Sequence, residues 1–364
     1  MDGERLRILH VLDHVRNDGN GIVNVVVDLA CAQADAGDHV AIASDGGEYE
    51  PLLAAHGVDH HRLMREDSAA GRVRVVARLN RIVGKVRPVI VNAHRAYATI
   101  SGRVLRPLHS FALIATDHNE FEAKGRLLGT ANLIIAVSDG AAASLAATGV
   151  NRNRIRVVQN GPLFGAREVR GDSASDVVTL ARPAIVTVAA LVQRKGIHVL
   201  LEAFETVAAE HSEVNLYFVG DGPERGALET RRRESRFAER IHIEGFQREP
   251  AAYLRGADVF VLASFREPFG LAALEARGAG CAVVVSGVDG LPETVDRGEA
   301  GMIVAPGDAD ALAGALTSLL ISSAQLARWR ERAGRGLERF SAARMARDTD
   351  AVYREALSGR GRRL

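Results

Sequence analysis

Residues 257–276 read ADVFVLASFREPFGLAALEA, and this stretch decides the fold class. The run at 259–262 has no polar alternation, which is typical of a strand buried on both faces of a parallel sheet. Pro268 and Gly270 fit poorly inside a helix, so a loop is expected there. Leu271–Ala279 then has the pattern of a helix. A buried strand, a loop and a helix in this order form one repeat of an α/β sheet.

The same alternation continues outward from this stretch in both directions. The strands expected in a first unit are 7–12, 39–44, 89–92, 112–116, 133–137 and 155–158. Those expected in a second unit are 185–190, 215–219, 241–244, 259–262, 282–285 and 301–304. Helical patterns such as 21–36 and 141–147 lie between them, and the tail at about 308–357 is expected to be helical throughout. The pattern predicts two parallel α/β units.

The length of 364 residues is comfortable for two domains. We expect a first domain at 1–165 and a second at 184–340. Residues 166–183 mix Pro, Gly, Ser and charges without periodicity and are expected to form a linker. A last helix at 341–364 is expected to pack back toward the first domain.

The composition excludes several classes of protein. Hydrophobic residues make up 47% of the chain and charged residues 25%, which excludes a disordered chain, a collagen and a multi-span membrane protein. The net charge of +1 gives no global attraction to nucleic acid, so no nucleic-acid partner is expected. The N-terminus MDGERLRILHVLDHV predicts no signal peptide, and we expect a cytoplasmic protein. Cys31 and Cys281 lie in apolar stretches without zinc spacing, which favours two buried thiols.

Glu267 and Glu275 are the most informative candidates for a site. Glu267 falls in the loop after a buried strand, and Glu275 falls about one turn into the next helix. Carboxylates accept hydrogen bonds from vicinal hydroxyls, so two of them at this spacing favour two sugar rings. The amides of 269–271 between them would begin a helix, where a diphosphate fits. The alternative is a turn cap and a solvated helix face.

Two further loops of the second unit carry candidate residues. Arg194 and Lys195 precede a helix expected to begin at Gly196, and cations in such a loop favour phosphate contact. Ordinary surface charge is the alternative. Gly220, after the strand at 215–219, allows a tight turn and by itself indicates only a strand-to-helix connector.

The first unit places its candidates after strands as well. Gly19, Asn20 and Gly21 form a turn that allows close backbone approach to a ligand, without the spacing of a dinucleotide fingerprint. His94 and His118 each follow a strand and are expected at one edge of the sheet. Histidines at such positions are either structural or functional.

Together these segments resemble the retaining glycosyltransferases of family four, which have the GT-B fold of two Rossmann-like α/β/α domains facing across a cleft. The resemblance runs in order through nearly the whole chain. It includes the turn at 19–21, His94, the helix led by Ser138, Asn160-Gly161, Arg194-Lys195-Gly196, 220–223, Glu267 to Glu275 and the segment 291–294. The Glu-x7-Glu segment with its EPFG core is the most specific part.

The resemblance implies roles for these residues. Glu267 would contact hydroxyls of the donor hexose, Glu275 the ribose of the nucleotide, Lys195 the diphosphate, and His94 the region of the transferred sugar. The expected catalytic residues are His94, Glu267 and Lys195. The expected donor-binding residues are Gly19, Gly21, Arg194, Lys195, Gly220, Phe246, Phe269, Gly270, Leu271 and Glu275. Asn20, Arg95, Asp117 and His118 are expected on the acceptor side.

The chain departs from the family pattern at three places. Ala189-Ala190 replaces the usual Gly-Arg before the lysine loop, Pro162 replaces a frequent Asp, and Asp289-Gly290 replaces a common Gly-Gly. With Ala190 at the arginine position, one of the two usual diphosphate cations is missing, and Arg194 is the candidate to compensate.

The resemblance implies a retaining hexosyltransferase that uses a UDP- or GDP-hexose and a hydroxyl acceptor, in glycolipid, polysaccharide or small-molecule glycoside biosynthesis. The alternatives are a nucleotide-sugar 2-epimerase of the same fold and a non-catalytic nucleotide-sugar-binding protein. No metal or other cofactor is expected. The acids at 308–310 and 348–350 are interpreted as helix-start and surface residues.

A basic segment at 72–87 points to a further partner. No Asp or Glu occurs from Ser68 to Thr116, and residues 74, 78, 81 and 85 form a stripe beside an apolar one. This pattern predicts peripheral association with the anionic inner face of a membrane, or a phosphorylated or lipid-linked acceptor. A solvated basic helix face is the alternative.

Overall fold

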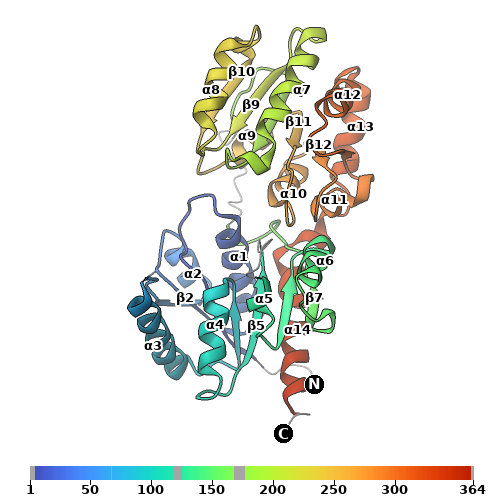
Figure 1. Cartoon of the computed structure of the whole chain (residues 1–364). Coiled ribbons are helices and arrows are strands. Elements are labelled where there is room, and N and C mark those ends of the chain that lie inside the picture. The colour runs from blue at the N-terminus through green and yellow to red at the C-terminus, as the bar shows by residue number, and fades with distance from the viewer. Residues whose placement is uncertain (1–4, 67, 119–124, 168–176, 362–364) are drawn as a thin grey trace. The chain divides into compact units, whose positions relative to one another are not determined.

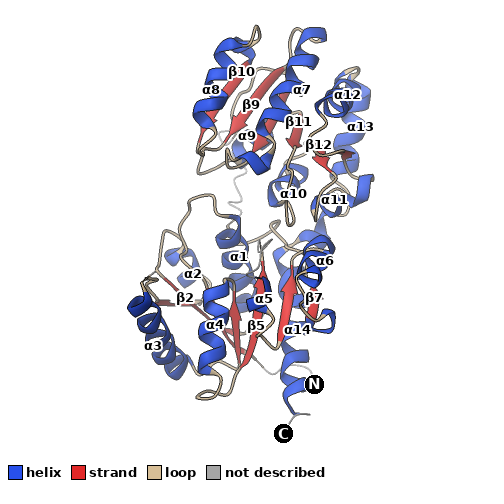
Figure 2. Cartoon of the chain, viewed as in Figure 1, coloured by secondary structure: helices blue, strands red, loops and turns tan. Residues whose placement is uncertain are grey.

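The computed structural model describes residues 5–66, 68–118, 125–167 and 177–361. The chain divides into two compact units, one of Met1–Val169 with Glu338–Leu364 and one of Arg170–Leu337. Each unit is a parallel β-sheet covered by helices (Figure 2). The predicted α/β class with two Rossmann-like units is confirmed. Half of the expected linker, residues 168–176, lies outside the described residues.

The first unit holds a seven-stranded sheet in the order β3-β2-β1-β4-β5-β6-β7. Its strands are β1 (Arg7–Val11), β2 (His39–Ser44), β3 (Asp59–Arg62), β4 (Ile90–Ala93), β5 (Ala112–Asp117), β6 (Leu133–Ala136) and β7 (Ile155–Val157). Its helices are α1 (Gly21–Asp35), α2 (Glu50–Ala55), α3 (Ala69–Val86), α4 (Ala96–Leu105), α5 (Gly125–Leu128), α6 (Asp139–Ala147) and α14 (Ala342–Gly361). The last helix, α14, packs on α1, β5 and β6 and so completes this unit (Figure 1).

The second unit holds a six-stranded sheet in the order β10-β9-β8-β11-β12-β13. Its strands are β8 (Ala184–Val188), β9 (Asn215–Val219), β10 (Ile241–Gly245), β11 (Val259–Leu262), β12 (Ala282–Ser286) and β13 (Met302–Val304). Its helices are α7 (Ile197–Glu210), α8 (Arg225–Glu234), α9 (Ala251–Gly256), α10 (Leu271–Gly278), α11 (Leu291–Thr294), α12 (Ala309–Leu320) and α13 (Ser323–Ala333). All strand pairs in both sheets are parallel.

Strand β11 shows why the deciding stretch lacks polar alternation. Val259 and Val261 belong to a core cluster that includes α7 and α12, whereas Phe260 and Leu262 belong to a second cluster with α9 and α10. Both faces of the strand are therefore covered, and all four side chains are buried. Burying an apolar side chain of this size contributes roughly 1.5–3 kcal/mol.

The structure corrects two details of the expected elements. Strand β3 was not predicted, because its sequence DHHR is polar and it lies at the edge of the sheet, half exposed. The tail at 308–357 is not helical throughout. Ser322 starts a new helix by accepting a hydrogen bond from the Gln325 amide at 3.1 Å, and Gly336 adopts a left-handed φ of 66° beyond α13.

Gly196 sets the approach of two loops in the second unit. It has a φ of 63°, and a Cβ at this position would overlap the carbonyl oxygen of Ala263. A glycine here thus lets the loop after β8 lie directly against the loop after β11. The 3-10 turn at 193–195 precedes Gly196, so α7 begins one residue later than predicted, at Ile197.

Both cysteines are buried free thiols, as predicted, and burial raises the pKa of each to about 12. Among the described helices, no single one is both long and apolar enough to cross a membrane. Only α12 and α13 taken together reach the length and hydropathy required, and they meet at a bend of 105°.

Candidate functional site

The candidate residues lie at the carboxyl ends of parallel strands, where ligands bind in open α/β sheets. In the first unit the chain leaves the neighbouring strands β1 and β4 in opposite directions across the sheet, and β8 and β11 do the same in the second unit. The loops after these strands separate at such a reversal. The 19–21 turn and His94 follow the first pair, and Lys195 and Glu267 follow the second.

Lys195 and Glu267 form a largely buried ion pair at the reversal point of the second sheet. The Lys195 Nζ donates to Oε2 of Glu267, and Ser264 Oγ lies 3.5 Å from the same oxygen. The lysine side chain is 13% exposed and that of the glutamate 11%. Two residues predicted to hold different parts of one ligand thus contact each other directly.

Asp289 holds the backbone of this loop and was not predicted as a site residue. Its Oδ2 accepts the Glu267 amide at 2.8 Å and pairs with Arg266 Nε at 3.0 Å. The Gly290 amide in turn donates to the Glu267 carbonyl at 3.2 Å. Asp289 has a left-handed φ of 44°. It therefore positions Glu267 from a separate turn, where the sequence had shown only a departure from the family's Gly-Gly.

The helix α10 presents its N-terminus directly after Glu267. Gly270, its N-cap, has a φ of 106° and makes no side-chain cap, and a Cβ there would overlap Leu291. Phe269 is buried and Leu271 is the first helical residue. Glu275 lies in the second turn of the same helix, as predicted. Amides at an N-terminus carry partial positive charge and suit an anion.

Arg194 ties the two loops together. Its carbonyl accepts the Phe265 amide at 2.8 Å, and its Nη1 donates to the Arg266 carbonyl at 3.3 Å. Gly220 has a φ of 143°, and a Cβ there would overlap the carbonyl of Ala189. Its close packing is that of a strand-to-helix connector. Phe246 follows β10 and is 45% exposed.

In the first unit, the 19–21 turn begins α1. Gly19 has a φ of 78°, and Asn20 Oδ1 accepts the Ile22 amide at 3.1 Å as the N-cap of the helix. Asn20 thus has a structural use beside its predicted acceptor-side role. Arg95, after β4, pairs with Asp13 after β1 at 2.9 Å. Asp117 is the buried last residue of β5.

Three histidines form a hydrogen-bonded row across three neighbouring strands. His10 Nδ1 lies 2.9 Å from His94 Nε2, and His94 Nδ1 lies 2.9 Å from His118 Nε2. The inner end of the row is the contact of His10 Nε2 with Gln33 Oε1 at 2.8 Å. His94 and His118 were predicted at one edge of the sheet, and the structure brings them into contact there. His10, inside an apolar strand, and Gln33, inside an apolar helix, were missed.

The row is uncharged at neutral pH. Burial lowers the pKa of His10 to about 4, with the Gln33 hydrogen bond opposing it, and lowers the pKa of His118 to about 3, with Arg95 adding to the effect. Burial and the two neighbouring rings hold the pKa of His94 well below its ordinary value. Each ring therefore carries a single N–H.

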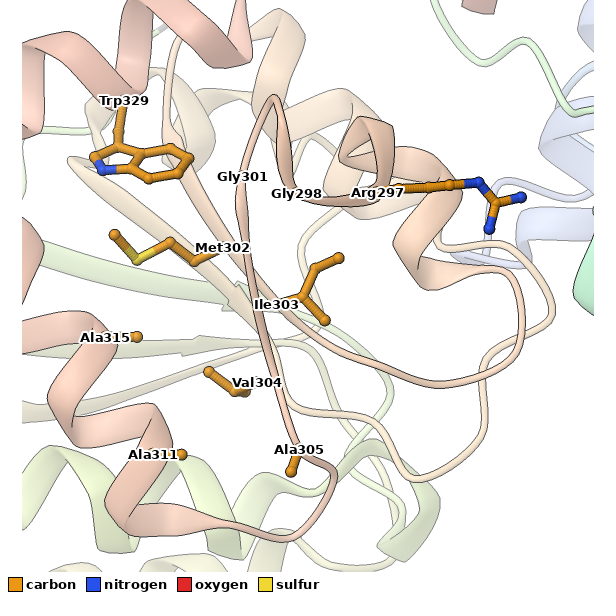
Figure 3. Close-up of a pocket in the computed structure, with 10 residues that line it drawn as sticks. All are labelled: Arg297, Gly298, Gly301, Met302, Ile303, Val304, Ala305, Ala311, Ala315 and Trp329. Atoms are coloured by element: carbon orange, nitrogen blue, oxygen red, sulfur yellow. The ribbon is translucent and has the colours of Figure 1, made fainter.

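A pocket elsewhere in the second unit takes no part in this site. It has a volume of about 600 Å³ and lies along the edge strand β13, where Met302 and Val304 point toward the side of Trp329 of α13 and Ile303 points the other way (Figure 3). None of the predicted donor-binding residues lines it.

Sequence profiles of known families match both units. The profile described as Glycosyltransferase Family 4 matches residues 19–161, and the one described as Glycosyl transferases group 1 matches residues 182–322. The chain belongs to glycosyltransferase family four. The predicted family membership and the GT-B fold are confirmed.

Named relatives agree with the family. The lipopolysaccharide core biosynthesis glycosyltransferase LpsE of Rhizobium meliloti is 32% identical over 181 residues, which cover 50% of this chain and 52% of LpsE. LpsD of the same organism is 25% identical over 316 residues, covering 86% of this chain and 88% of LpsD. HepE from Anabaena, solved with UDP and glucose, has the same fold, with a TM-score of 0.79 at 19% identity over 97% of this chain and 100% of that one. The match thus spans about half of LpsE. The roles of single residues stay predictions.

The histidine row predicts how the stability of the first unit of this family-four glycosyltransferase depends on pH. The pKa values of all three histidines are lower in the folded state than the unfolded value of about 6.5, so the unfolded state binds more protons below that pH. The contribution of the three rings to the free energy of unfolding is fully present above pH 6.5, and it is lost as the pH falls through about 4 for His10 and about 3 for His118. If the unfolded state binds up to three more protons, the free energy of unfolding falls by up to roughly 4 kcal/mol for each pH unit.

Native-state hydrogen exchange of the β1, β4 and β5 amides, corrected for intrinsic rates, measures this slope between pH 6.5 and 5. The amides of β8, β9 and β11 in the second unit serve as the internal control. An equal slope in both units would show that the row contributes nothing of its own.

Proposed function

We propose that this glycosyltransferase is a retaining hexosyltransferase that moves a hexose from a UDP- or GDP-hexose to a hydroxyl acceptor. The observation that carries the proposal is the largely buried pair of Lys195, in the turn before α7, and Glu267, in the loop that leads into α10. A lysine, a carboxylate and a helix N-terminus offer a cation for phosphate, an acceptor for sugar hydroxyls and amides for an anion. HepE, whose crystals hold UDP and glucose, supports a UDP-hexose.

The donor would be held mainly by the second unit. Lys195, with Arg194, would neutralise the diphosphate, and the 269–271 amides would approach the same charge. Glu267 would then exchange part of its contact with Lys195 for hydroxyls of the hexose. Glu275, one turn farther along α10, would accept from the ribose. Because Asp289 fixes the Glu267 backbone, the carboxylate is already placed before a ligand arrives.

Retention would follow from attack on the face from which the nucleotide leaves. The bond between the anomeric carbon and the diphosphate oxygen breaks, the bond from the acceptor oxygen to that carbon forms, and the acceptor proton passes to a diphosphate oxygen. The protein then supplies charge neutralisation and alignment rather than a nucleophile. His94 would act on the side of the transferred sugar through His118, because both of its ring nitrogens contact neighbouring histidines.

This scheme requires no metal ion, because cations of the chain and helix amides would meet the diphosphate charge. Three of the four acids considered in the sequence have other uses. Asp308 Oδ1 caps α12 by accepting the Ala311 amide at 2.8 Å. Asp348 pairs with Arg344, and Asp350 pairs with Arg354.

The acceptor would be a glycan or glycolipid under assembly, and the names of LpsE and LpsD support this class. The basic helix α3 would bring the enzyme to an anionic lipid surface. Glu66 pairs with Arg74 and with Arg78, which weakens the predicted stripe, and Arg81 and Lys85 are exposed farther along the helix. Exposed apolar side chains lie beside α3, on and just after the neighbouring helix α4. Val104 of α4 is 55% exposed, and Leu108, three residues beyond the end of α4, is 70% exposed.

Two carboxylate variants test the donor site. Glu275→Ala should weaken UDP or GDP binding at least tenfold, because a charge-assisted hydrogen bond worth roughly 1.5–3 kcal/mol is lost. Glu267→Ala should leave that affinity within a few fold but depress transfer. Calorimetric titration with each nucleotide measures the first effect, and nucleoside diphosphate release measures the second.

Glu331→Ala, at a well-exposed glutamate of the same unit, is the matched control for both assays. If Glu267→Ala and Glu275→Ala both bind nucleotide like the parent, this loop does not hold the donor. Conversion of the donor alone into an isomeric nucleotide sugar would instead establish the epimerase.

Transfer should continue in EDTA, and the product should keep the anomeric configuration of the donor. Proton NMR of the product reports the configuration in the same reaction tube. Loss of turnover in EDTA that manganese or magnesium restores would overturn the metal-free scheme, and an inverted anomer would overturn retention.

The membrane association is tested with vesicles. The full chain should co-sediment with vesicles rich in anionic lipid and not with neutral ones, and the double variant Arg81→Ala/Lys85→Ala should bind roughly tenfold or more weakly, at about 1 kcal/mol per basic residue. Arg231→Ala/Arg233→Ala, which removes two exposed arginines from α8, is the control. Equal weakening by both double variants would leave α3 without a special role.

A further inference from the structure

The histidine row has a direction, and Gln33 sets it. Each ring in the row is neutral and has one N–H, so every hydrogen bond between two rings needs a donor on one and a lone pair on the other. The row ends on Gln33 Oε1, which can only accept. His10 Nε2 must therefore carry the proton and donate at 2.8 Å, which leaves His10 Nδ1 as an acceptor.

The same requirement passes outward along the row. His94 Nε2 donates to His10 Nδ1, and His118 Nε2 donates to His94 Nδ1, each at 2.9 Å. Both ring nitrogens of His94 are thus engaged within the row. His118, the most exposed of the three at 9% against 3% and 0%, is left with an unprotonated Nδ1.

We propose that Gln33 and His10 are positioning residues that fix the tautomers of His94 and His118, so that the outer end of the row accepts a hydrogen bond from a sugar hydroxyl and disfavours a phosphate oxygen. The inference rests on the proposed transferase function for the identity of that sugar. An unprotonated ring nitrogen offers a lone pair to an O–H, whereas a phosphate oxygen facing it finds no proton. The row thereby selects a hydroxyl on the sugar side of the reaction.

The row fixes which nitrogen of each ring is protonated, and it does not conduct protons. A carboxamide oxygen at the inner end does not take up a proton near neutral pH, so a proton entering at His118 would have no group to receive it. The Gln33 Nε2 at that end is buried without a hydrogen-bond partner among the described residues, so the carboxamide is held in the row through its oxygen. A second buried layer lies in the same sheet, where Asn92 donates to Tyr353 of α14 at 2.7 Å and accepts from Thr116 at 2.9 Å.

Nitrogen-15 NMR of the full chain, labelled at histidine, identifies the tautomers directly. It uses the long-range couplings between the ring nitrogens and the protons on the ring carbons. The wild type should show His10, His94 and His118 all protonated at Nε2. Gln33→Leu removes the acceptor and should give a mixture of tautomers in all three rings. Gln33→Glu keeps an acceptor oxygen and should retain the Nε2–H forms.

Measuring kcat and the Kd for UDP or GDP together distinguishes a positioning role of Gln33 from a role in folding. Gln33→Leu should lower kcat about tenfold while the Kd for UDP or GDP stays unchanged, because the donor nucleotide is held in the other unit. Gln33→Glu should recover most of the loss. The matched control is Asn80→Leu, since His109 Nε2 bonds Asn80 Oδ1 at 2.7 Å in the same unit but outside the row. It should shift only the His109 signals and leave kcat unchanged.

Three results would overturn the proposal. Wild-type rings protonated at Nδ1 would show that the amide of Gln33 faces the other way and that the row runs in reverse. Unchanged tautomers in Gln33→Leu would show that Gln33 does not set them. A loss of kcat equal in Gln33→Glu and Gln33→Leu would show that acceptor chemistry at this position is irrelevant. The wild-type spectrum needs no variant to fold and no transfer to occur, so absent transferase activity would refute the proposed function alone.

Discussion

The reversal of chain direction within each parallel sheet is the constraint on which the rest of the structure depends. Right-handed crossovers carry the chain from β8 to one side and from β11 to the other, so the loops after these neighbouring strands separate at the carboxyl edge. The opening must still be narrow enough for Lys195 to reach Glu267. Gly196 makes that possible, because any side chain there would overlap the loop after β11.

Burying polar groups at these edges is costly unless each has a partner, and the two units meet this requirement differently. The second unit buries opposite charges together and supports the carboxylate loop with Asp289. The first unit buries neutral rings and satisfies them one by one down to Gln33. A charged edge suits a diphosphate, and an uncharged edge suits hydroxyls. This difference in charge is the reason for proposing that the second unit binds the diphosphate of the donor and that the first unit binds sugar hydroxyls.

The sequence predicted those features whose cause is local. A strand buried on both faces, as β11 is, carries its apolar run in consecutive residues, and the turn that places Glu267 follows at once. Strand β3 was not predicted because an edge strand needs no apolar run. Contacts between distant residues left no local signal. Lys195 and Glu267 are 72 residues apart, and Asp289 reaches Glu267 from 22 residues away. His10 and Gln33 sit in apolar patterns that indicate only core.

The same reasoning explains why the departure at Ala190 is compatible with the rest of the site. Arg194 lies after the same strand and already bonds the carbonyl of Arg266, beside Glu267. A guanidinium fixed there can face a diphosphate without a second arginine at 190, since its planar group presents several donors at once. Under the proposed function, Arg194 would supply from the same loop the cation that the family pattern has at position 190. Asp289, which replaces a glycine of the family pattern, adds a negative charge beside Arg266. Lys195 is the cation that pairs with the carboxylate of Glu267. The two departures therefore act on one loop, and the charge that a diphosphate would meet depends on both together.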